Sequence, residues 1–385
     1  MRWGILGGGT AGPAAALFLA RAGHDVVLYE RVEDPQPVGA GILLQPTGLA
    51  VLRRLGLLQR VLGRGERIDR LSGHTASGRM VLDLAYGDLR EGLHGLGIHR
   101  GALFSALWDA VKGEPRVTLC TGHTVTAIDE TPDGAVLSGL RGHDGEGELW
   151  RSEPFDRVVV AAGARSSLRP PGASVKPYPW GALWFVAHQN PLPGVLAQRF
   201  RDTRQMVGIL PSGEGSVSVF WSLRADALPA WCAAGIDAWK SEVAALMPEV
   251  PIDAVRSADD VIFAPYFDVV SPTWHHGRTV WLGDAGHAMS PQLGQGANLA
   301  LQDAAALADA PDLATYSRAR SDQVRFYSFA SRALTPFFQS SWPILAPARD
   351  LVAGPLHAWG WYRRQMVASL VGVKTGFFTE MGVPE

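Results

Sequence analysis

A cluster of glycines near the N-terminus has the composition and spacing of a phosphate-binding turn. Gly7, Gly9 and Gly12 follow the apolar segment 2–6 and precede the segment 13–22, which has helical character. In such a turn the first glycine permits a tight bend, the second lets the backbone approach a pyrophosphate, and the third lets helix and strand pack closely. The unpaired N–H groups at the start of the helix then favour an anion. We expect this turn to bind the pyrophosphate of a dinucleotide.

An acidic residue at the end of the next strand supports that interpretation. Residues 26–29 form a second apolar strand, and Glu30 follows it directly. A carboxylate at this place can accept hydrogen bonds from both ribose hydroxyls of an adenosine, whereas a 2′-phosphate would be repelled. The glycine pattern also occurs as an ordinary turn in a βαβ unit, and it does not by itself distinguish FAD from NAD.

A second motif in the C-terminal half favours FAD. Asp284 follows the apolar strand 279–282, and an acid at the end of a strand can hold a sugar-alcohol hydroxyl. A Gly-x-Gly turn leading into a helix presents N–H groups and a positive dipole end to an anion, such as the negative edge of reduced flavin. We expect a helix over 299–310 and cofactor contacts from the preceding segment, with Ala297 and Asn298 as donors; the contact residues are Pro291, Gly294, Gly296, Ala297 and Asn298.

The remaining pattern predicts an α/β protein with two kinds of sheet. Continuous apolar runs such as 158–161 are typical of buried parallel strands. Four segments after residue 170 are instead rich in β-branched and aromatic residues, which indicates an inserted antiparallel sheet. These segments are 181–189, 196–201, 205–210 and 215–223. Helices are expected over 49–62, 103–111, 234–247 and most of 316–370, and a turn over 142–147.

The predicted elements divide the chain into two domains and a C-terminal segment. We expect a discontinuous, Rossmann-like FAD-binding domain formed by 1–70, 97–170 and 270–318. The inserted antiparallel sheet would form a substrate domain from 71–96 and 171–269. Residues 319–385 would form a C-terminal helical segment.

The composition argues against some kinds of binding partner and indicates a cellular compartment. The 35 Lys and Arg residues nearly balance the 37 Asp and Glu residues, which argues against nucleic acid or a polybasic membrane contact. Two cysteines are too few for a disulfide framework, so a reducing, cytoplasmic location is expected. The pattern predicts neither a signal peptide nor a transmembrane segment. His275 and His276 lack a third ligand at useful spacing, so no metal site is predicted.

These motifs resemble those of the FAD-dependent monooxygenases of the single-component aromatic hydroxylase type, the p-hydroxybenzoate hydroxylase-like family. The resemblance is carried by the fingerprint through Glu30-Arg31, by the mid-chain segment 161–169, and by the long segment 282–298. The segments 39–46 and 98–107 also match. The resemblance implies that Arg31, Arg100 and Gly163 belong to the FAD site and that Val125 lies near the adenine.

The resemblance also implies a reaction. In this family NADH or NADPH binds transiently and reduces the FAD, which reacts with O₂ to give a flavin C4a-hydroperoxide. One oxygen atom then enters an aromatic or polycyclic small molecule. Where the family has an aspartate in its mid-chain motif, this chain has Ala162, which bears on the use of the nucleotide. Three alternatives stay open: a separate flavin reductase, another flavin-dependent oxidoreductase such as a reductase or dehydrogenase, and a flavin-binding protein without turnover.

Candidate substrate residues lie on the predicted inserted sheet and beside the second motif. Trp184, Trp221 and Tyr266 can line an apolar pocket, although aromatic residues also fill ordinary cores. His188 is the one candidate for proton transfer, with a structural histidine as the competing interpretation. Arg204 can bind an anionic substrate or lie on a solvated face. Pro291 and Gln292 complete the set, and the sequence indicates neither the substrate's identity nor the oligomeric state.

Overall fold

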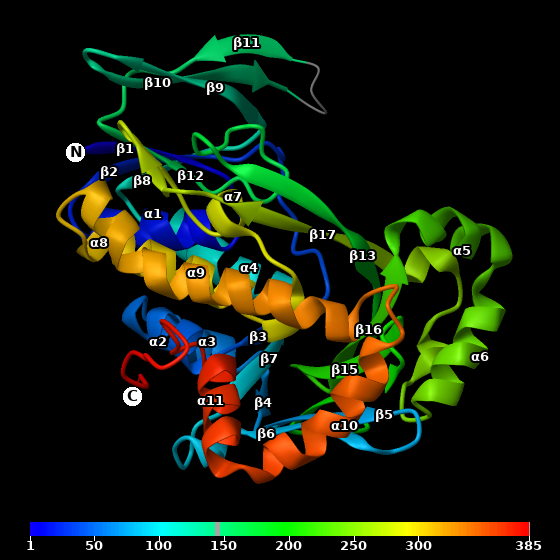
Figure 1. The fold of residues 1–385 in the computed structure, drawn as a ribbon. Coiled ribbons are helices and arrows are strands. Elements are labelled where there is room, and N and C mark those ends of the chain that lie inside the picture. The colour runs from blue at the N-terminus through cyan, green and yellow to red at the C-terminus, as the bar shows by residue number, and fades with distance from the viewer. Residues whose placement is uncertain (143–146, 385) are drawn as a thin grey trace.

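The computed structural model describes residues 1–142 and 147–384, so most of the turn predicted over 142–147 lies outside the described residues. A six-stranded sheet forms one half of the molecule (Figure 1). Its neighbouring strands pair in parallel, except for the antiparallel pair β18 and β19 at one edge. In spatial order the strands are β18 (His275–His276), β19 (Thr279–Trp281), β12 (Arg157–Val160), β1 (Arg2–Leu6), β2 (Asp25–Tyr29) and β8 (Val117–Cys120).

Helices cover this sheet and build the largest core. Helix α1 (Ala11–Arg21) begins two residues before the predicted start and is buried along almost its whole length. Helix α8 (Gly296–Asp309) lies beside it, and α4 (Arg100–Lys112) packs on the other side of α1 (Figure 1). The apolar β1 and β12 lie beneath these helices, which is why their sequences are almost continuously hydrophobic.

A seven-stranded sheet forms the other half. Its strands pair in antiparallel fashion, apart from the parallel pair β14 and β5. The sheet joins two sequence regions, because β5 and β6 precede the mid-chain strands by about a hundred residues. In spatial order they are β17 (Ile262–Val270), β13 (Ser174–Ala187), β16 (Ser216–Arg224), β15 (Gln205–Gly213), β14 (Val195–Arg201), β5 (Arg70–Thr75) and β6 (Met80–Ala85).

Two small sheets were not expected as separate units. The first connects the two large halves and contains β3 (Gly41–Leu44), β7 (Gly95–His99) and β4 (Glu66–Ile68). The second is a three-stranded antiparallel sheet at the far end of the molecule, built from β11 (Glu148–Arg151), β10 (Gly134–Arg141) and β9 (His123–Thr131) (Figure 1).

The predicted helix over 49–62 is wrong in one respect. It consists of α2 (Pro46–Arg54) and α3 (Leu58–Leu62), separated at Gly56, whose φ of +67° is left-handed. The predicted helix over 234–247 is preceded by another, so that α5 (Leu228–Ala234) and α6 (Ile236–Leu246) cover one face of the seven-stranded sheet.

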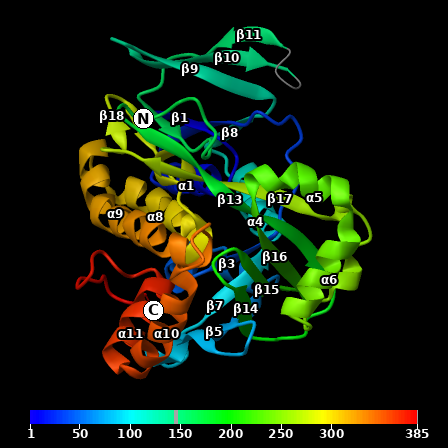
Figure 2. The same ribbon diagram turned by 45° about the vertical axis from the view of Figure 1, so that its right-hand side comes forward.

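The C-terminal region is helical, as predicted. It contains α9 (Leu313–Phe338), α10 (Leu345–Ala358) and α11 (Gly360–Val371). The last two contact β6 (Figure 1) and lie at the end of the seven-stranded sheet that carries β5 (Figure 2). A short α7 (Asp284–His287) follows β19. The 3-10 turns are η1 (Tyr86–Asp88), η2 (Ala225–Ala227), η3 (Ile252–Ala254), η4 (Ala258–Asp260) and η5 (Pro291–Leu293).

None of the described helices combines the length and the apolar character that crossing a membrane requires. Within residues 1–142 and 147–384, no three His, Cys, Asp or Glu side chains form a group that could hold a metal ion.

Candidate cofactor and substrate site

The three positions of the first motif require glycine for different structural reasons. Gly7 has a φ of +107°, and a Cβ atom built on it would lie 2.6 Å from the carbonyl oxygen of Ala161. A Cβ on Gly12 would lie 1.9 Å from the carbonyl oxygen of Gly7, so helix and turn touch there. A Cβ on Gly9 would meet nothing within 4 Å. The fold therefore requires Gly7 and Gly12, whereas Gly9 leaves open space at the positive end of α1, where a phosphate would bind.

The Glu30 carboxylate is held in place beside this turn. One oxygen accepts a hydrogen bond of 2.7 Å from the Gly8 N–H group, and the other accepts one of 2.9 Å from the Val32 N–H group. Each carboxylate oxygen has further lone pairs, so Glu30 can still accept hydrogen bonds from ribose hydroxyls. Arg31 follows it with an exposed side chain.

The mid-chain motif meets the first motif at the ends of neighbouring strands. Gly163 has a φ of +75°, and the space next to its Cα is open. Ala162, at the position of the missing aspartate, is exposed. Val125 lies half-buried in the adjoining cluster of β9. Arg169 donates to the Ala164 carbonyl group and keeps a buried Nη1 without a partner among the described residues.

The second motif lies at the start of α8. This helix begins at Gly296 rather than at 299, so the N–H groups of Gly296, Ala297 and Asn298 occupy its first turn and have no intrahelical acceptor. Asp284 is exposed and has a carboxylate oxygen 3.8 Å from a Cβ built on Gly296. A carboxylate and free N–H groups therefore lie side by side, as a sugar-alcohol chain and an anionic ring edge would require.

The Asn298 side chain has a structural function. Its amide nitrogen donates to the carbonyl groups of Leu43 at 3.1 Å and Gly294 at 3.0 Å, and its oxygen accepts from the Gln45 N–H group at 2.8 Å. The side chain thus ties β3 to the loop before α8. A cofactor can be reached from the backbone N–H group of Asn298, not from this amide.

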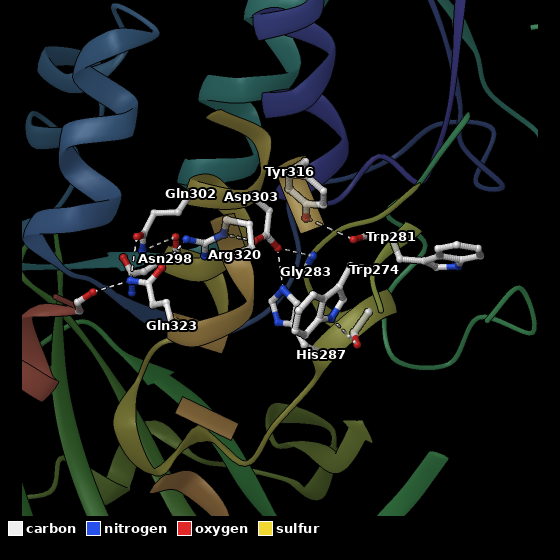
Figure 3. A network of polar contacts seen from close by, with 12 residues as sticks. Trp274, Trp281, Gly283, His287, Asn298, Gln302, Asp303, Tyr316, Arg320 and Gln323 are labelled. Carbon is white, nitrogen blue, oxygen red and sulfur yellow. Dashed lines mark hydrogen bonds and ion pairs between the residues drawn. The ribbon is translucent and has the colours of Figure 1, made fainter. Parts of the chain in front are cut away.

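A buried network of hydrogen bonds and ion pairs connects the second motif to helix α9 (Figure 3). The Asp303 carboxylate accepts hydrogen bonds from the Gly283 N–H group at 2.8 Å, from His287 Nε2 at 2.6 Å and from Arg320 Nε at 2.7 Å. Burial by itself raises the pKa of Asp303, but the charges and hydrogen bonds of His287 and Arg320 outweigh it and lower the pKa overall. The network fixes the turn that carries Asp284.

This network was not identified from the sequence. An acidic residue on an otherwise apolar helix face was the available signal, but its partner Arg320 lies on a different helix, α9.

Gln45 contacts Asn298 of α8, and Arg100 lies beside Gly39. Gln45 is fully buried, its oxygen accepts a 2.7 Å hydrogen bond from the Tyr86 hydroxyl, and its Nε2 has no partner among the described residues. Arg100 is exposed, and its Cδ lies 3.2 Å from a Cβ built on Gly39. The orphaned donor of Gln45, the free N–H groups of α8 and the open space at Gly9 together fit FAD.

A cavity of about 380 Å³ adjoins the second motif. It lies between β5, β6 and β14 on one side and α9, α10 and α11 on the other, with Gln292 and Leu293 at its boundary. Its lining is mostly apolar and includes Leu71, Leu82, Leu334, Phe337, Phe338 and Met366. Such a cavity suits a small aromatic molecule.

The predicted aromatic residues divide between the two faces of the seven-stranded sheet. Trp184 and Tyr266 pack on the face that carries the cavity, and the Trp184 ring lies 5.1 Å from that of Phe220. Trp221 lies on the opposite face, in the cluster that packs against Trp239 of α6. Neighbouring residues of a strand point to opposite faces, which separates Trp221 from the cavity.

His188 and Arg204 do not line the cavity. The His188 side chain is exposed and its Nδ1 lies 2.9 Å from Ser216 Oγ. Arg204 forms a 2.7 Å ion pair with Asp202, and its side chain is 57% exposed. Pro291 is exposed at the start of η5, and Gln292 donates a 2.8 Å hydrogen bond to Gln339 of the α9 C-terminus.

Comparisons with known proteins agree with this geometry. A family model described as an FAD binding domain matches residues 3–333. The chain is 30% identical to the 6-hydroxynicotinate 3-monooxygenase of Bordetella bronchiseptica over 336 residues, which covers 80% of this chain and 81% of the relative. It is 28% identical to the protoasukamycin 4-monooxygenase of Streptomyces nodosus subsp. asukaensis, over 80% of this chain and 78% of the relative.

Solved structures share the fold. The structure of Klebsiella pneumoniae HpxO with FAD and uric acid superposes with a TM-score of 0.78 at 21% identity and covers 97% of both chains. That of the p-nitrophenol 4-monooxygenase PnpA from Pseudomonas putida gives a TM-score of 0.77 at 18% identity, over 95% of this chain and 96% of the other. The relatives do not favour the alternatives of another flavin-dependent oxidoreductase, such as a reductase or dehydrogenase, or of a non-catalytic flavin-binding protein. The chain belongs to the FAD binding domain family and is an FAD-dependent monooxygenase of the aromatic hydroxylase type.

Proposed function

We propose that this monooxygenase hydroxylates an apolar aromatic or polycyclic molecule held in the cavity between the seven-stranded sheet and helices α9 to α11. The observation that carries the proposal is the position of the cavity. Gln292 and Leu293 line it, and both belong to the segment that leads into the free N–H groups of α8. A substrate there lies beside the residues that fit the flavin ring.

The site residues have distinct functions in this proposal. Bound FAD supplies the activation of O₂ and the delivery of one oxygen atom to an electron-rich ring. Glu30 and the N-terminus of α1 hold the adenosine and pyrophosphate, and Asp284 holds the sugar-alcohol chain. The N–H groups of Gly296 and Ala297 stabilise negative charge at the ring edge. The apolar cavity lining excludes water from the reacting centre.

The balance of the reaction requires two electrons from outside. One atom of O₂ enters a C–H bond of the substrate and the other leaves as water, while NADH or NADPH is oxidised to NAD⁺ or NADP⁺. A nicotinamide nucleotide is typical for the family, and only its direct use by this chain is open, because Ala162 replaces the acid of the mid-chain motif. A separate flavin reductase is the alternative electron source. We also propose a reducing, cytoplasmic location, which the free thiols of Cys120 and Cys232 support.

The lining of the cavity favours an apolar substrate, whereas the relatives are named for substrates of several kinds. Some relatives have names that denote carboxylates, as 6-hydroxynicotinate and 3-amino-4-hydroxybenzoate do. Others are named for protoasukamycin or for 6-methylpretetramide. The cavity of this chain has leucine and valine side chains on its sheet wall and leucine, phenylalanine and methionine side chains on its helical wall, which favours a substrate with a large apolar surface.

The test is a turnover measurement on the purified, flavin-loaded protein. We expect naphthols or hydroxyquinolines to stimulate the oxidation of NADH or NADPH and the uptake of O₂, and to yield a product heavier by one oxygen atom in mass spectrometry. If the oxygenated product forms only when an added flavin reductase supplies reduced FAD, the enzyme depends on a separate reductase. No oxygenated product under either condition, with any aromatic compound tried, would refute the proposal.

A further inference from the structure

Part of the cavity wall comes from the end of the chain. Helices α10 and α11 lie beyond residues 3–333, which the family model matches. Both line the cavity, together with β5, β6 and β14 of the seven-stranded sheet. Among the described lining residues, the polar side chains are Gln198, Gln292, Arg349, His357 and Tyr362.

The one guanidinium of that lining is already engaged. Arg349 is buried and donates to the carbonyl groups of Asp202 at 3.1 Å and Phe337 at 2.9 Å. It also forms a 2.8 Å ion pair with Asp350. Its planar group lies 5.2 Å from the Phe200 ring and 5.5 Å from the Phe338 ring. The charge is therefore neutralised and fixed by packing, and an anionic substrate would gain little from it.

His357, in contrast, has an unused acceptor. It is buried with 6% of its surface exposed, and its Nδ1 has no hydrogen-bond partner among the described residues. Hydrogen bonding to the backbone of Val81 on β6 raises the pKa of His357, and because Nδ1 has no partner we assign the ring proton to Nε2. In a neutral imidazole the other nitrogen then carries a free lone pair. A buried acceptor without a partner is costly, unless a ligand satisfies it.

We propose that His357 accepts a hydrogen bond from an O–H or N–H group of a neutral aromatic substrate, and that the cavity disfavours substrates with a carboxylate. This inference rests on the proposed function in one respect, namely that the cavity is the substrate site. It adds the chemical class of the substrate and the residue that selects it. Tyr362, whose ring lies 6.2 Å from that of His357 at 87°, packs against the imidazole edge-on and limits its orientations.

Burial, more than the surrounding charges, favours the neutral form of the ring. Burial is the main cause that lowers the pKa of His357. Asp83 on β6 raises it, but Asp83 is paired with Arg70; Arg363 on α11 lowers it further and is itself paired with Asp88. Protonation in acid removes the acceptor lone pair, so the preference for a donor-bearing substrate should be lost as the pH falls below the pKa of His357.

The test compares three ligands by their binding to the flavin-loaded protein, measured by titration calorimetry. 2-Naphthol carries a donor, 2-methoxynaphthalene has the same ring without it, and 6-hydroxy-2-naphthoate adds a charge. We expect wild-type protein to bind 2-naphthol about tenfold more tightly than the ether, the effect of one neutral hydrogen bond, and to bind the naphthoate most weakly.

Variants identify the residue. His357→Phe keeps an apolar ring of similar size and should bind 2-naphthol and the ether equally. His357→Asn offers an amide oxygen near the Nδ1 position and should restore part of the preference. The matched control is His276→Phe, an exposed histidine on β18 in the other sheet, which should behave as wild type. Flavin content and circular dichroism confirm that each variant is folded.

Three results would overturn the inference: an unchanged preference for 2-naphthol in His357→Phe, the absence of binding by all three ligands, or binding of the naphthoate as tight as that of 2-naphthol. Turnover is read separately. A preference that depends on His357, without any oxygenated product, would refute the proposed function and leave the binding inference standing. Oxygenation of the naphthoate with an affinity equal to that of 2-naphthol would refute the inference and leave the function standing.

Discussion

The buried carboxylate of Asp303 permits a quantitative prediction. Replacement by asparagine in Asp303→Asn keeps the shape of the side chain and removes its charge. The Asp303 side chain is fully buried, and the Arg320 side chain that it pairs with is 6% exposed. Breaking such a pair leaves an uncompensated buried cation, which costs about 3–5 kcal/mol. We expect the free energy of unfolding to fall by this amount.

Another ion pair of the same helix provides the control. Asp309, the last residue of α8, pairs with Arg54, but the two side chains are 57% and 48% exposed. Solvent screens this pair, so Asp309→Asn should cost at most about 1 kcal/mol. The contrast between two carboxylates of one helix separates the effect of burial from that of removing a charge.

The assay is urea unfolding of the flavin-loaded protein, followed by tryptophan fluorescence and by the release of flavin fluorescence. Flavin release should shift at least as much as unfolding in Asp303→Asn, because the Gly283 N–H group loses the charged acceptor that fixes the turn of Asp284. A loss in Asp303→Asn no larger than that in Asp309→Asn would refute the reasoning, since burial would then have no measurable weight.

The same residue predicts a dependence on pH. The pKa of Asp303 is lower in the folded protein, so its stabilising effect is complete above the pKa of an unfolded aspartate, about 3.9. It is lost as the pH falls below that value and through the folded pKa. The difference in stability between wild type and Asp303→Asn should therefore be constant near neutrality and shrink in acid.

Three further predictions concern the cofactor site and the cavity. Gly9→Ala should fold normally but raise the dissociation constant of FAD at least tenfold, whereas Gly12→Ala should yield little folded protein, because its Cβ would lie 1.9 Å from a carbonyl oxygen; soluble yield and flavin titration distinguish them. Gln45→Leu removes a buried donor and should weaken FAD binding about tenfold in the same titration. Arg349→Met should lower the unfolding free energy by about 1–3 kcal/mol, and an unchanged urea midpoint would contradict the packing described for α10.

The cofactor half of the site was predictable from the sequence because its determinants are local. The turn of Gly7, Gly9 and Gly12, and the acid Glu30, lie within one βαβ unit, where spacing along the chain fixes spacing in the fold. The predicted start of α8 was wrong by three residues. Gly296 has the residue type of a loop, although it occupies the first turn of the helix.

The substrate half was not predictable, because its determinants are distant in sequence. Trp184 and Trp221 are equally good candidates for pocket residues from the sequence alone. Both faces of the sheet are covered, and the alternation of side chains along a strand does not show which face carries the cavity. His357 and Arg349 lie in a segment that reads only as helical. They reach the cavity only because α10 packs against β6, a contact between residues separated by about 270 positions.

The order of the strands in the six-stranded sheet has a consequence for biosynthesis. Strand β1 pairs with β12, where Trp3 lies opposite Arg157, and β12 pairs with β19, where Val158 lies opposite Thr279. The second cofactor motif follows only after β19 leaves the ribosome. The emerging N-terminal half thus exposes unpaired strand edges for most of its synthesis, and pairing of this kind is slow to form. The nascent chain has no complete FAD site, so a shortage of riboflavin should affect it little. The shortage should lower the yield of folded protein mainly at the later stage, when the sheet closes.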